Sequence, residues 1–209
     1  QYIVDQCYAN SNSAYCNLIS QRSSAGQLTE VNDTYANVGG LRTNGIDFDL
    51  NYRIRVTHHD SFTLTNNFQY LLGYREQNEP GGEWYNYTGR LFYQSGYGMP
   101  RIRNYATATW AHDNFSVTYM MSYTGAMKFS DGSSDLSCKV YTYCKVPGIF
   151  AHDVTLNYNT RNWQFQLGVN NLLDKKPPFV PDGSTNTALS MYSEEIIGRY
   201  VFAPSGRNC

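Results

Sequence analysis

Few residues in this chain have the types and spacing that perform chemistry. His58 and His59 stand side by side, as in some metal sites, but no third ligand lies near them in the sequence. Zinc sites use three or four protein ligands, so we interpret this pair as part of a solvated turn. Asp47 and Asp49 lie two positions apart, which places both carboxylates on one face of a strand. Paired carboxylates serve acid–base catalysis in enzymes, but they are also ordinary charges on a polar strand face. We predict neither a metal site nor a catalytic site here.

Other catalytic signatures are missing from the sequence. It contains no Ser/His/Asp arrangement, no glycine-rich phosphate loop and no nucleotide-binding motif. The formal net charge of −1 gives no electrostatic reason to expect a nucleic-acid partner. We therefore expect a protein that is not an enzyme and that needs no cofactor.

Four of the five cysteines form two close pairs, Cys7 with Cys16 and Cys138 with Cys144. Both pairs lie in segments that resemble loops, and neither has a second pair or histidines at zinc-ligand spacing. The favoured interpretation is two local disulfides formed in an oxidising compartment. Cys209 is left over in this scheme.

One loop segment has the composition of a ligand-binding surface. Aromatic side chains cluster in it beside charged ones, and such a set can stack on and hydrogen-bond a sugar, a siderophore or a cobalamin-like molecule. The candidate residues are Trp84, Tyr85, Tyr87, Arg75, Glu83 and Arg90. The alternative is an aromatic loop that packs on its own neighbours.

Alternation of apolar and polar residues predicts the elements that position these groups. This period of two is typical of half-buried strands. It indicates about seven strands, at 46–54, 62–72, 101–110, 115–123, 153–158, 163–169 and 192–202. No helix is predicted apart from a possible turn near 13–19.

Composition supports an all-β protein. Aromatic residues make up 15% of the chain and charged residues only 16%, and Tyr, Phe, Trp and Thr favour pleated surfaces. No apolar run is long enough for a transmembrane helix, but a membrane-spanning strand needs only about ten residues of alternating pattern.

The connections between the predicted strands alternate in length. Short turns at 57–60, 112–114 and 159–162 follow one another with long loops at 74–97, 124–148 and 174–191 between them. All short turns then lie at one end of the sheet, as in outer-membrane barrels. Aromatic residues near those turns form a candidate interfacial girdle, namely Phe62, Trp110, Phe115, Tyr158 and Trp163. The pattern predicts an antiparallel up-and-down meander, part of a transmembrane β-barrel. A soluble carbohydrate-binding β-sandwich also has alternating strands and stays open as an alternative.

Three motifs resemble those of TonB-dependent outer-membrane receptors. The stretch Gly168–Pro178 is similar to the motif that closes their penultimate strand, with Asn171, Leu172 and Asp174 at its matching positions. Gly198 and Arg199 resemble the entry into their final strand. Leu41–Tyr52 is similar to a strand in the second half of their barrels.

The resemblance implies a location in the outer membrane, with lipid around the barrel and short turns in the periplasm. It also implies that the cysteine pairs lie in extracellular loops. The family binds a scarce nutrient, such as a siderophore, a cobalamin-like molecule or an oligosaccharide, and imports it with energy from the TonB complex acting through a plug domain. Residues 1–39 are then expected to be an extracellular loop segment, and residues 40–209 the C-terminal barrel strands and loops.

The chain also departs from the family pattern. Nothing in it corresponds to the plug, so a fragment of a plug-less porin or adhesin stays open as a second alternative. The last strand turns to Ala203–Cys209, and Pro204 predicts that this strand is cut short or replaced. Seven strands leave two open edges, which lipid does not tolerate, so we expect no working pore from this chain alone.

Overall fold

The structure, a computed structural model, describes residues 2–9, 11, 13–32, 39–77, 81–92, 98–130, 139, 144–178 and 192–207. The chain divides into two compact units, Gln1–Val38 and Gly39–Cys209. Among the described residues, no helix has the length and apolar character needed to cross a bilayer.

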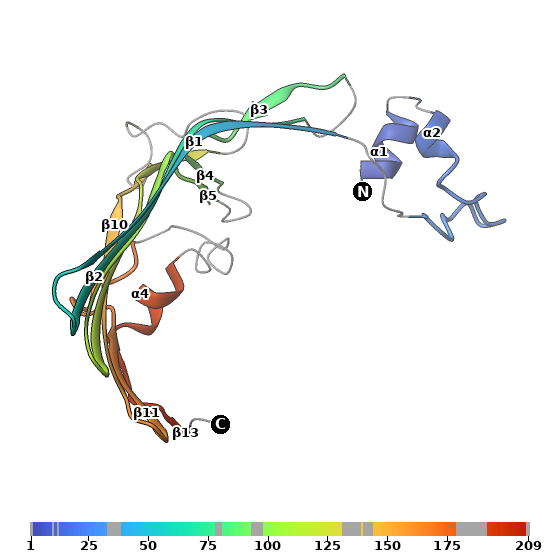
Figure 1. Cartoon of the computed structure of the whole chain (residues 1–209). Helices are drawn as coiled ribbons and strands as arrows, with labels where there is room; N and C mark the ends of the chain where they lie inside the picture. The colour runs from blue at the N-terminus through green and yellow to red at the C-terminus, as the bar shows by residue number, and fades with distance from the viewer. Residues whose placement is uncertain are drawn as a thin grey trace. The chain divides into compact units, whose positions relative to one another are not determined.

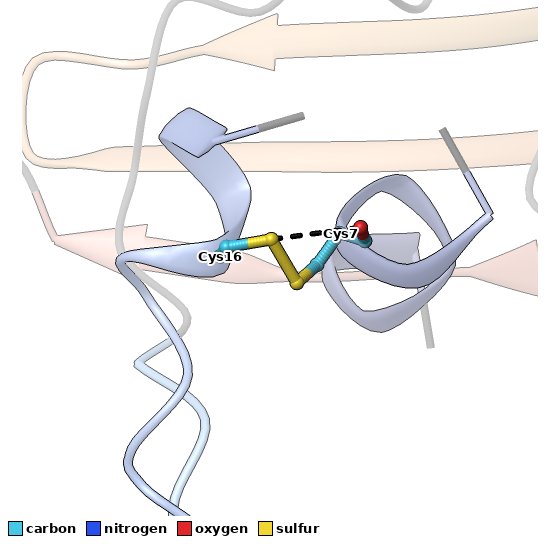
Figure 2. The surroundings of a disulfide bond; sticks show 2 residues. All are labelled: Cys7 and Cys16. Carbon is cyan, nitrogen blue, oxygen red and sulfur yellow. Dashed lines mark hydrogen bonds between the residues drawn. A yellow bond between two sulfur atoms is a disulfide. The ribbon is translucent and has the colours of Figure 1, made fainter. Parts of the chain in front are cut away.

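The first unit is a small disulfide-linked segment. It contains the helices α1 (Tyr2–Tyr8) and α2 (Ser13–Cys16), and Cys7 and Cys16 are joined by a disulfide, as Figure 2 shows. The sequence predicted only a turn near α2 and no helix at α1. Short helices with Ile, Val and Tyr have low intrinsic stability, so the cross-link, which propensity does not reveal, is what holds the two together.

The second unit is built on a nine-stranded antiparallel sheet (Figure 1). Its main path runs β1-β2-β6-β7-β10-β11-β12, while β3 pairs with β2 and β13 pairs with β11. The bounds are β1 Gly40–Arg55, β2 Asp60–Gln77, β3 Trp84–Asn86, β6 Ile102–His112, β7 Phe115–Thr124, β10 Ile149–Asn159, β11 Trp163–Asn170, β12 Tyr200–Phe202 and β13 Ser205–Arg207. Within the described residues β1 does not pair with β12, so the sheet does not close. The predicted all-β meander with two open edges is confirmed.

A second, smaller sheet lies in the long loops. It has the order β5-β4-β8-β9, made of β4 (Arg90–Phe92), β5 (Gly98–Met99), β8 (Met127–Ser130) and β9 (Lys145–Val146). The sequence did not predict it, because strands of two to four residues are too short to show periodicity.

Register places the apolar residues of the large sheet on one face. Ile54, Phe62 and Trp110 stand opposite one another across β1, β2 and β6, and the row continues through Val117 and Leu156. The alternate positions form a polar face, where the Thr109 and Thr118 hydroxyls lie 2.9 Å apart.

No protein layer covers this apolar face among the described residues. Phe48, Phe165 and Leu167 are 55%, 47% and 46% exposed, values that no soluble core allows. The buried hydrophobic cluster lies in and beside the loops instead, and comprises Leu91, Met127, Phe129, Val146, Ile149 and Tyr192. A soluble sandwich would place a second sheet over the exposed face, and the structure describes none there.

The short turns carry the predicted aromatic girdle and a set of charged contacts. Phe62 pairs with Trp110, whose ring centroid lies 6.2 Å from that of Phe115 in an edge-on arrangement. At the same end Asp60 bonds His112 Nδ1 at 2.8 Å, which raises the pKa of the imidazole. His59 of the predicted solvated turn bonds Asp113 at 2.6 Å.

The end of the chain differs from the expectation in two ways. Residues 193–197 form the helix α4 (Ser193–Ile197) rather than a strand, and Gly198, with a φ of 80°, ends it. The last strand is also not cut short, since β12 and β13 together pair with β11 from Asn170 to Trp163. Pro204 is tolerated because only its carbonyl is used, as acceptor from the Gln166 N–H at 3.1 Å.

Phe202 attaches this last strand by packing on Gly168, its partner in β11. The ring occupies the space that a side chain at position 168 would need. We expect Phe202→Ala to weaken the attachment by about 1 kcal/mol, the value of a good cross-strand pair. Hydrogen exchange of residues 200–207, measured in neutral detergent micelles, should accelerate roughly fivefold. Val201→Ala, on the opposite face, is the matched control, and equal acceleration in both variants would contradict this role of Phe202.

Candidate functional site

The predicted aromatic cluster is divided by the pleat of β3. Trp84, Tyr85 and Asn86 pair with Gln77, Glu76 and Arg75 at the end of β2. Successive residues of a strand point to opposite faces. Trp84 and Tyr85 therefore belong to different surfaces, and the six candidates do not form one site.

Trp84 packs against β1. The Arg42 guanidinium carbon lies 4.1 Å from the centroid of the Trp84 ring, a cation–π contact. The approach is close enough that a Cβ atom on Gly40 would lie 2.8 Å from the same ring. Arg75 stands opposite Arg42 in the register. This side of β3 fits the alternative in which the aromatic loop packs on its neighbours.

Tyr85 and Tyr87 lie on the other side with Glu76. Tyr87 meets the Tyr74 ring edge-on at a centroid distance of 6.4 Å, and its N–H donates to the Tyr74 carbonyl at 2.9 Å. Burial, and then the nearby Glu76 and Tyr85, raise the pKa of the Tyr87 phenol. Tyr87 is therefore a neutral hydrogen-bonding group at physiological pH. Glu83 is exposed to solvent.

Two of the predicted candidates line pockets. Arg75 lines one of about 420 Å³ together with Arg42, and Arg90 lines a larger, partly open one. The larger pocket has a volume of about 760 Å³, within the size range of small-molecule sites. Its basic lining residues are Arg90, Arg101, Lys128 and Lys145. Sequence reasoning missed the last three, because they come from three separate segments of the chain and no motif links them.

The small loop sheet holds these charges in place. Arg90 pairs with Lys128 across β4 and β8, and Lys128 pairs with Lys145 across β8 and β9. Their neighbours Leu91, Phe129 and Val146 are fully buried. Burial of one face of the sheet therefore fixes which face carries the cations.

The cysteine positions are described in part. Besides the Cys7–Cys16 bond, Cys144 is disulfide-bonded and lies in the loop that precedes β9. Cys138 and Cys209 lie outside the described residues.

The closing motif centres on Asn171, which is fully buried and has a φ of 51°. Its Nδ2 donates to the Lys175 carbonyl at 2.9 Å and its Oδ1 accepts from the Lys175 N–H at 2.7 Å. Its own N–H donates to Asp153 Oδ1 at 2.7 Å, and the Leu172 N–H donates to the His152 carbonyl. The side-chain amide thus replaces a strand partner where β11 turns into the loop.

Asp174 joins the two halves of the motif. Its Oδ1 accepts from the Arg199 N–H at 3.2 Å, and a Cβ atom on Gly198 would lie 3.4 Å from the same oxygen. This backbone hydrogen bond, followed by Lys176, lowers the pKa of the Asp174 carboxyl. The start of the long loop is therefore tied to Arg199, the residue that precedes the last strand.

The helix α4 places a buried acidic group on the polar side of the sheet. Tyr192 and Glu195 are 2% and 7% exposed, and Asp153 of β10 is 7% exposed. Burial, followed by Glu195, raises the pKa of Tyr192 to about 12. Burial and then the charge of Asp153 raise the pKa of Glu195.

The groups that these sites present are suited to binding a ligand. Within the described residues, no three His, Cys, Asp or Glu side chains gather in a metal-binding group. Cationic, aromatic and amide groups line the loops, and these recognise ligands by charge, stacking and hydrogen bonds.

A family model described as TonB dependent receptor-like, beta-barrel matches residues 12–172 of this chain, which is more than half of it. This match confirms the resemblance drawn from the sequence. It ends at Leu172, so Asp174, Gly198 and Arg199 lie beyond it and their family roles stay a prediction. No curated protein matches the chain.

Replacement of Asn171 separates hydrogen bonding from backbone strain. Asn171→Ala removes both side-chain bonds to Lys175 and places an alanine in the left-handed region, so we expect a loss of about 3 kcal/mol in unfolding free energy. Asn171→Gly removes the same bonds without the strain and should lose about 1 kcal/mol less. Denaturant titration in detergent measures both. Leu172→Ala, at an exposed side chain, is the control, and a loss as large as that of Asn171→Ala would refute the assignment.

Glu195 makes the docking of α4 depend on pH. Its folded-state pKa lies above the unfolded value of 4.5, so its contribution is fully present below that value and is lost as pH rises through the folded pKa. We expect exchange protection of residues 192–198, corrected for intrinsic rates, to be higher at acidic pH. Glu195→Gln should remove this dependence and raise protection at neutral pH. Glu83→Gln carries the same charge change at an exposed site, and it should behave as the unaltered protein.

Proposed function

We propose that this chain, which belongs to the TonB-dependent receptor-like β-barrel family, forms wall and extracellular loops of a receptor that captures a scarce nutrient. Import of that nutrient draws on energy from the TonB complex. Proteins of this family are outer-membrane transport receptors, and the ligand and energy coupling of this chain are our proposal.

The observation that carries the proposal is the difference between the two ends of the sheet. One end has three tight turns, closed by contacts such as those of Asp60 with His112. The other end carries a second sheet with its own hydrophobic cluster and a pocket of about 760 Å³. A packed, cationic loop layer on one side only is what a receptor facing its ligand needs.

The exposed apolar face gives the wall its orientation toward lipid. The cross-strand row of Ile54, Phe62 and Trp110 lies beside the short turns. Aromatic rings are favoured at a bilayer interface, so this end of the sheet lies at one. Short turns then face the periplasm, and the loop pocket and Cys144 face outward. The Gln1–Val38 unit, which precedes β1 at its loop end, is an extracellular segment in this arrangement.

The two edges of the sheet are where further strands of the barrel would pair. Within the described residues β1 pairs only with β2, and β12 and β13 pair only with β11. Unpaired backbone groups in lipid cost several kcal/mol each, so further strands of the receptor cover both edges. The polar face, with Asp49 bonded to Asn67 at 2.6 Å, lines the interior and faces a plug domain through which TonB acts.

Uptake in the presence and absence of TonB tests this function. Cells that make the complete gene product containing this chain should import at least one of radiolabelled ferric siderophores, cobalamin or oligosaccharides. We expect that import to fall to background when TonB is deleted, because the barrel itself supplies no energy.

Cysteine labelling controls for insertion and orientation in both strains. A membrane-impermeant maleimide should label Glu83→Cys on intact cells and should not label His58→Cys until the outer membrane is opened. Import that persists without TonB would favour a plug-less porin. Labelling of His58→Cys but not of Glu83→Cys on intact cells would show the opposite orientation and contradict the proposal.

A further inference from the structure

Two arginines lie on the side of the sheet that carries the apolar residues. Arg42 of β1 and Arg75 of β2 are direct cross-strand partners, and both are exposed. Alternate residues of a strand share a face, and β1 runs without a break over Gly40–Arg55. Arg42 therefore points to the same side as Ile46 and Phe48, the side that the proposed function turns toward lipid.

The register shift between β1 and β2 keeps the two arginines on one face. β2 carries one extra residue, Leu72, at this shift. Beyond it Asn44 pairs with Gly73, and a Cβ atom on Gly73 would collide with the Asn44 side chain. These two positions therefore face the same way. Arg42 and Arg75, two residues further along each strand, do so as well.

The length of β1 places these arginines at the far edge of the apolar band. Twelve residues separate Arg42 from Ile54, which lies beside a short turn. A strand rises about 3.4 Å per residue and is tilted by roughly 40° in a membrane barrel, so Arg42 lies about 30 Å from Ile54 along the membrane normal. The outward apolar band of such barrels is about 25 Å tall. The two guanidinium groups therefore lie where the hydrocarbon ends and the lipid phosphates begin.

The Trp84 ring holds one of the two guanidinium groups in place. The Arg42 guanidinium carbon lies 4.1 Å from the centroid of that ring, and Trp84 itself pairs with Gln77 of β2. Tryptophan is enriched at membrane interfaces, in agreement with this level on the wall. A ring against the face of a guanidinium leaves the N–H groups, which lie in the guanidinium plane, able to donate to an anion. The contact therefore orients the cation and leaves its charge in place.

The two arginines line a common hollow of about 420 Å³. Its other described lining residues are Thr43, Asn44, Leu72 and Gly73, and none of the six is a carboxylate. The Leu72 side chain is 47% exposed. Cationic and amide donors thus lie beside an apolar side chain, a combination that suits a phosphate joined to a hydrocarbon-bearing group.

We propose that this hollow binds a phosphate group of lipid A, the phosphorylated glycolipid of the outer leaflet, on the membrane side of the wall. The inference rests on the proposed function, which places the wall in the outer membrane with its long loops outward. Arg42 and Arg75 donate charge-assisted hydrogen bonds to the phosphate oxygens, as the planar guanidinium fork favours. Trp84 packs against the sugar, and Leu72 meets the first carbons of the acyl chains. The site lies outside the barrel interior and ties the wall to its own membrane.

Titration of the complete gene product in neutral detergent with two forms of lipid A tests this site. We expect the bisphosphorylated form to bind. The form without phosphates, which has the same sugars and acyl chains, should bind roughly tenfold more weakly. Arg42→Gln and Arg75→Gln should each raise the Kd of the bisphosphorylated form roughly tenfold, because each removes charge-assisted hydrogen bonds. Native mass spectrometry measures the fraction of protein that carries lipid.

Arg53→Gln is the matched control. Arg53 is an exposed arginine of the same strand, and its odd-numbered position faces the barrel interior. Its replacement makes the same change in charge and should leave the Kd unchanged. Arg42→Lys keeps the charge but loses the fork, so it should bind more tightly than Arg42→Gln. Thermal melts establish that each variant is folded.

Inorganic phosphate distinguishes a lipid site from a site for soluble anions. At the lipid A concentration that half-saturates the hollow, an equal concentration of inorganic phosphate should displace no lipid, because it lacks the contacts of the sugar and the acyl chains. Displacement would assign the hollow to a soluble anion and overturn the proposal.

Two further outcomes would overturn it: equal Kd values for the two forms of lipid A, or the same Kd in Arg42→Gln, Arg75→Gln and Arg53→Gln. If import by cells still depends on TonB in that case, the receptor function stands and only the lipid site is removed. If bisphosphorylated lipid A binds as expected but import persists without TonB, the lipid site stands and the proposed energy coupling fails.

Discussion

A sheet in lipid must satisfy all its backbone hydrogen bonds within itself, because hydrocarbon offers no donors or acceptors. The other features of the wall follow from this constraint. Long strands pair residue by residue from β1 to β11, and Pro204 lies where only its carbonyl is needed. The same constraint tolerates side chains such as Phe48 and Leu167 without a protein cover, because lipid takes the place of a core.

The Gly39–Cys209 unit is therefore stabilised in two different ways in its two parts. The wall depends on strand pairing and on lipid, whereas the loops depend on a protein core around Phe129 and Tyr192. That core lies next to the larger pocket, so the pocket residues rest on a packed layer. Asn171 and Asp174 tie the end of β11 to the loop that follows it and to Arg199, the residue before β12.

Sequence periodicity located the strands well where the two faces meet different surroundings. The predicted 115–123 and 163–169 became Phe115–Thr124 and Trp163–Asn170. Of the predicted strand 192–202, only Tyr200–Phe202 is a strand. The prediction is wrong before it, where Tyr192 and Glu195, three residues apart, turn inward at helical spacing. It also missed where β1 begins and β2 ends, and the register shift near Gly45. The pocket could not be predicted at all, because the parallel pairing of Arg90 with Lys128 joins distant segments without any local signal.

That parallel pairing has a consequence for biogenesis. β4 and β8 are separated in the chain by β6 and β7, which form an antiparallel pair in the wall. Pairing across such a separation closes a long loop, and its entropic cost falls once the intervening hairpin has formed. The small loop sheet therefore depends on the wall for its assembly, because the pairing of β6 with β7 brings the segments of β4 and β8 together.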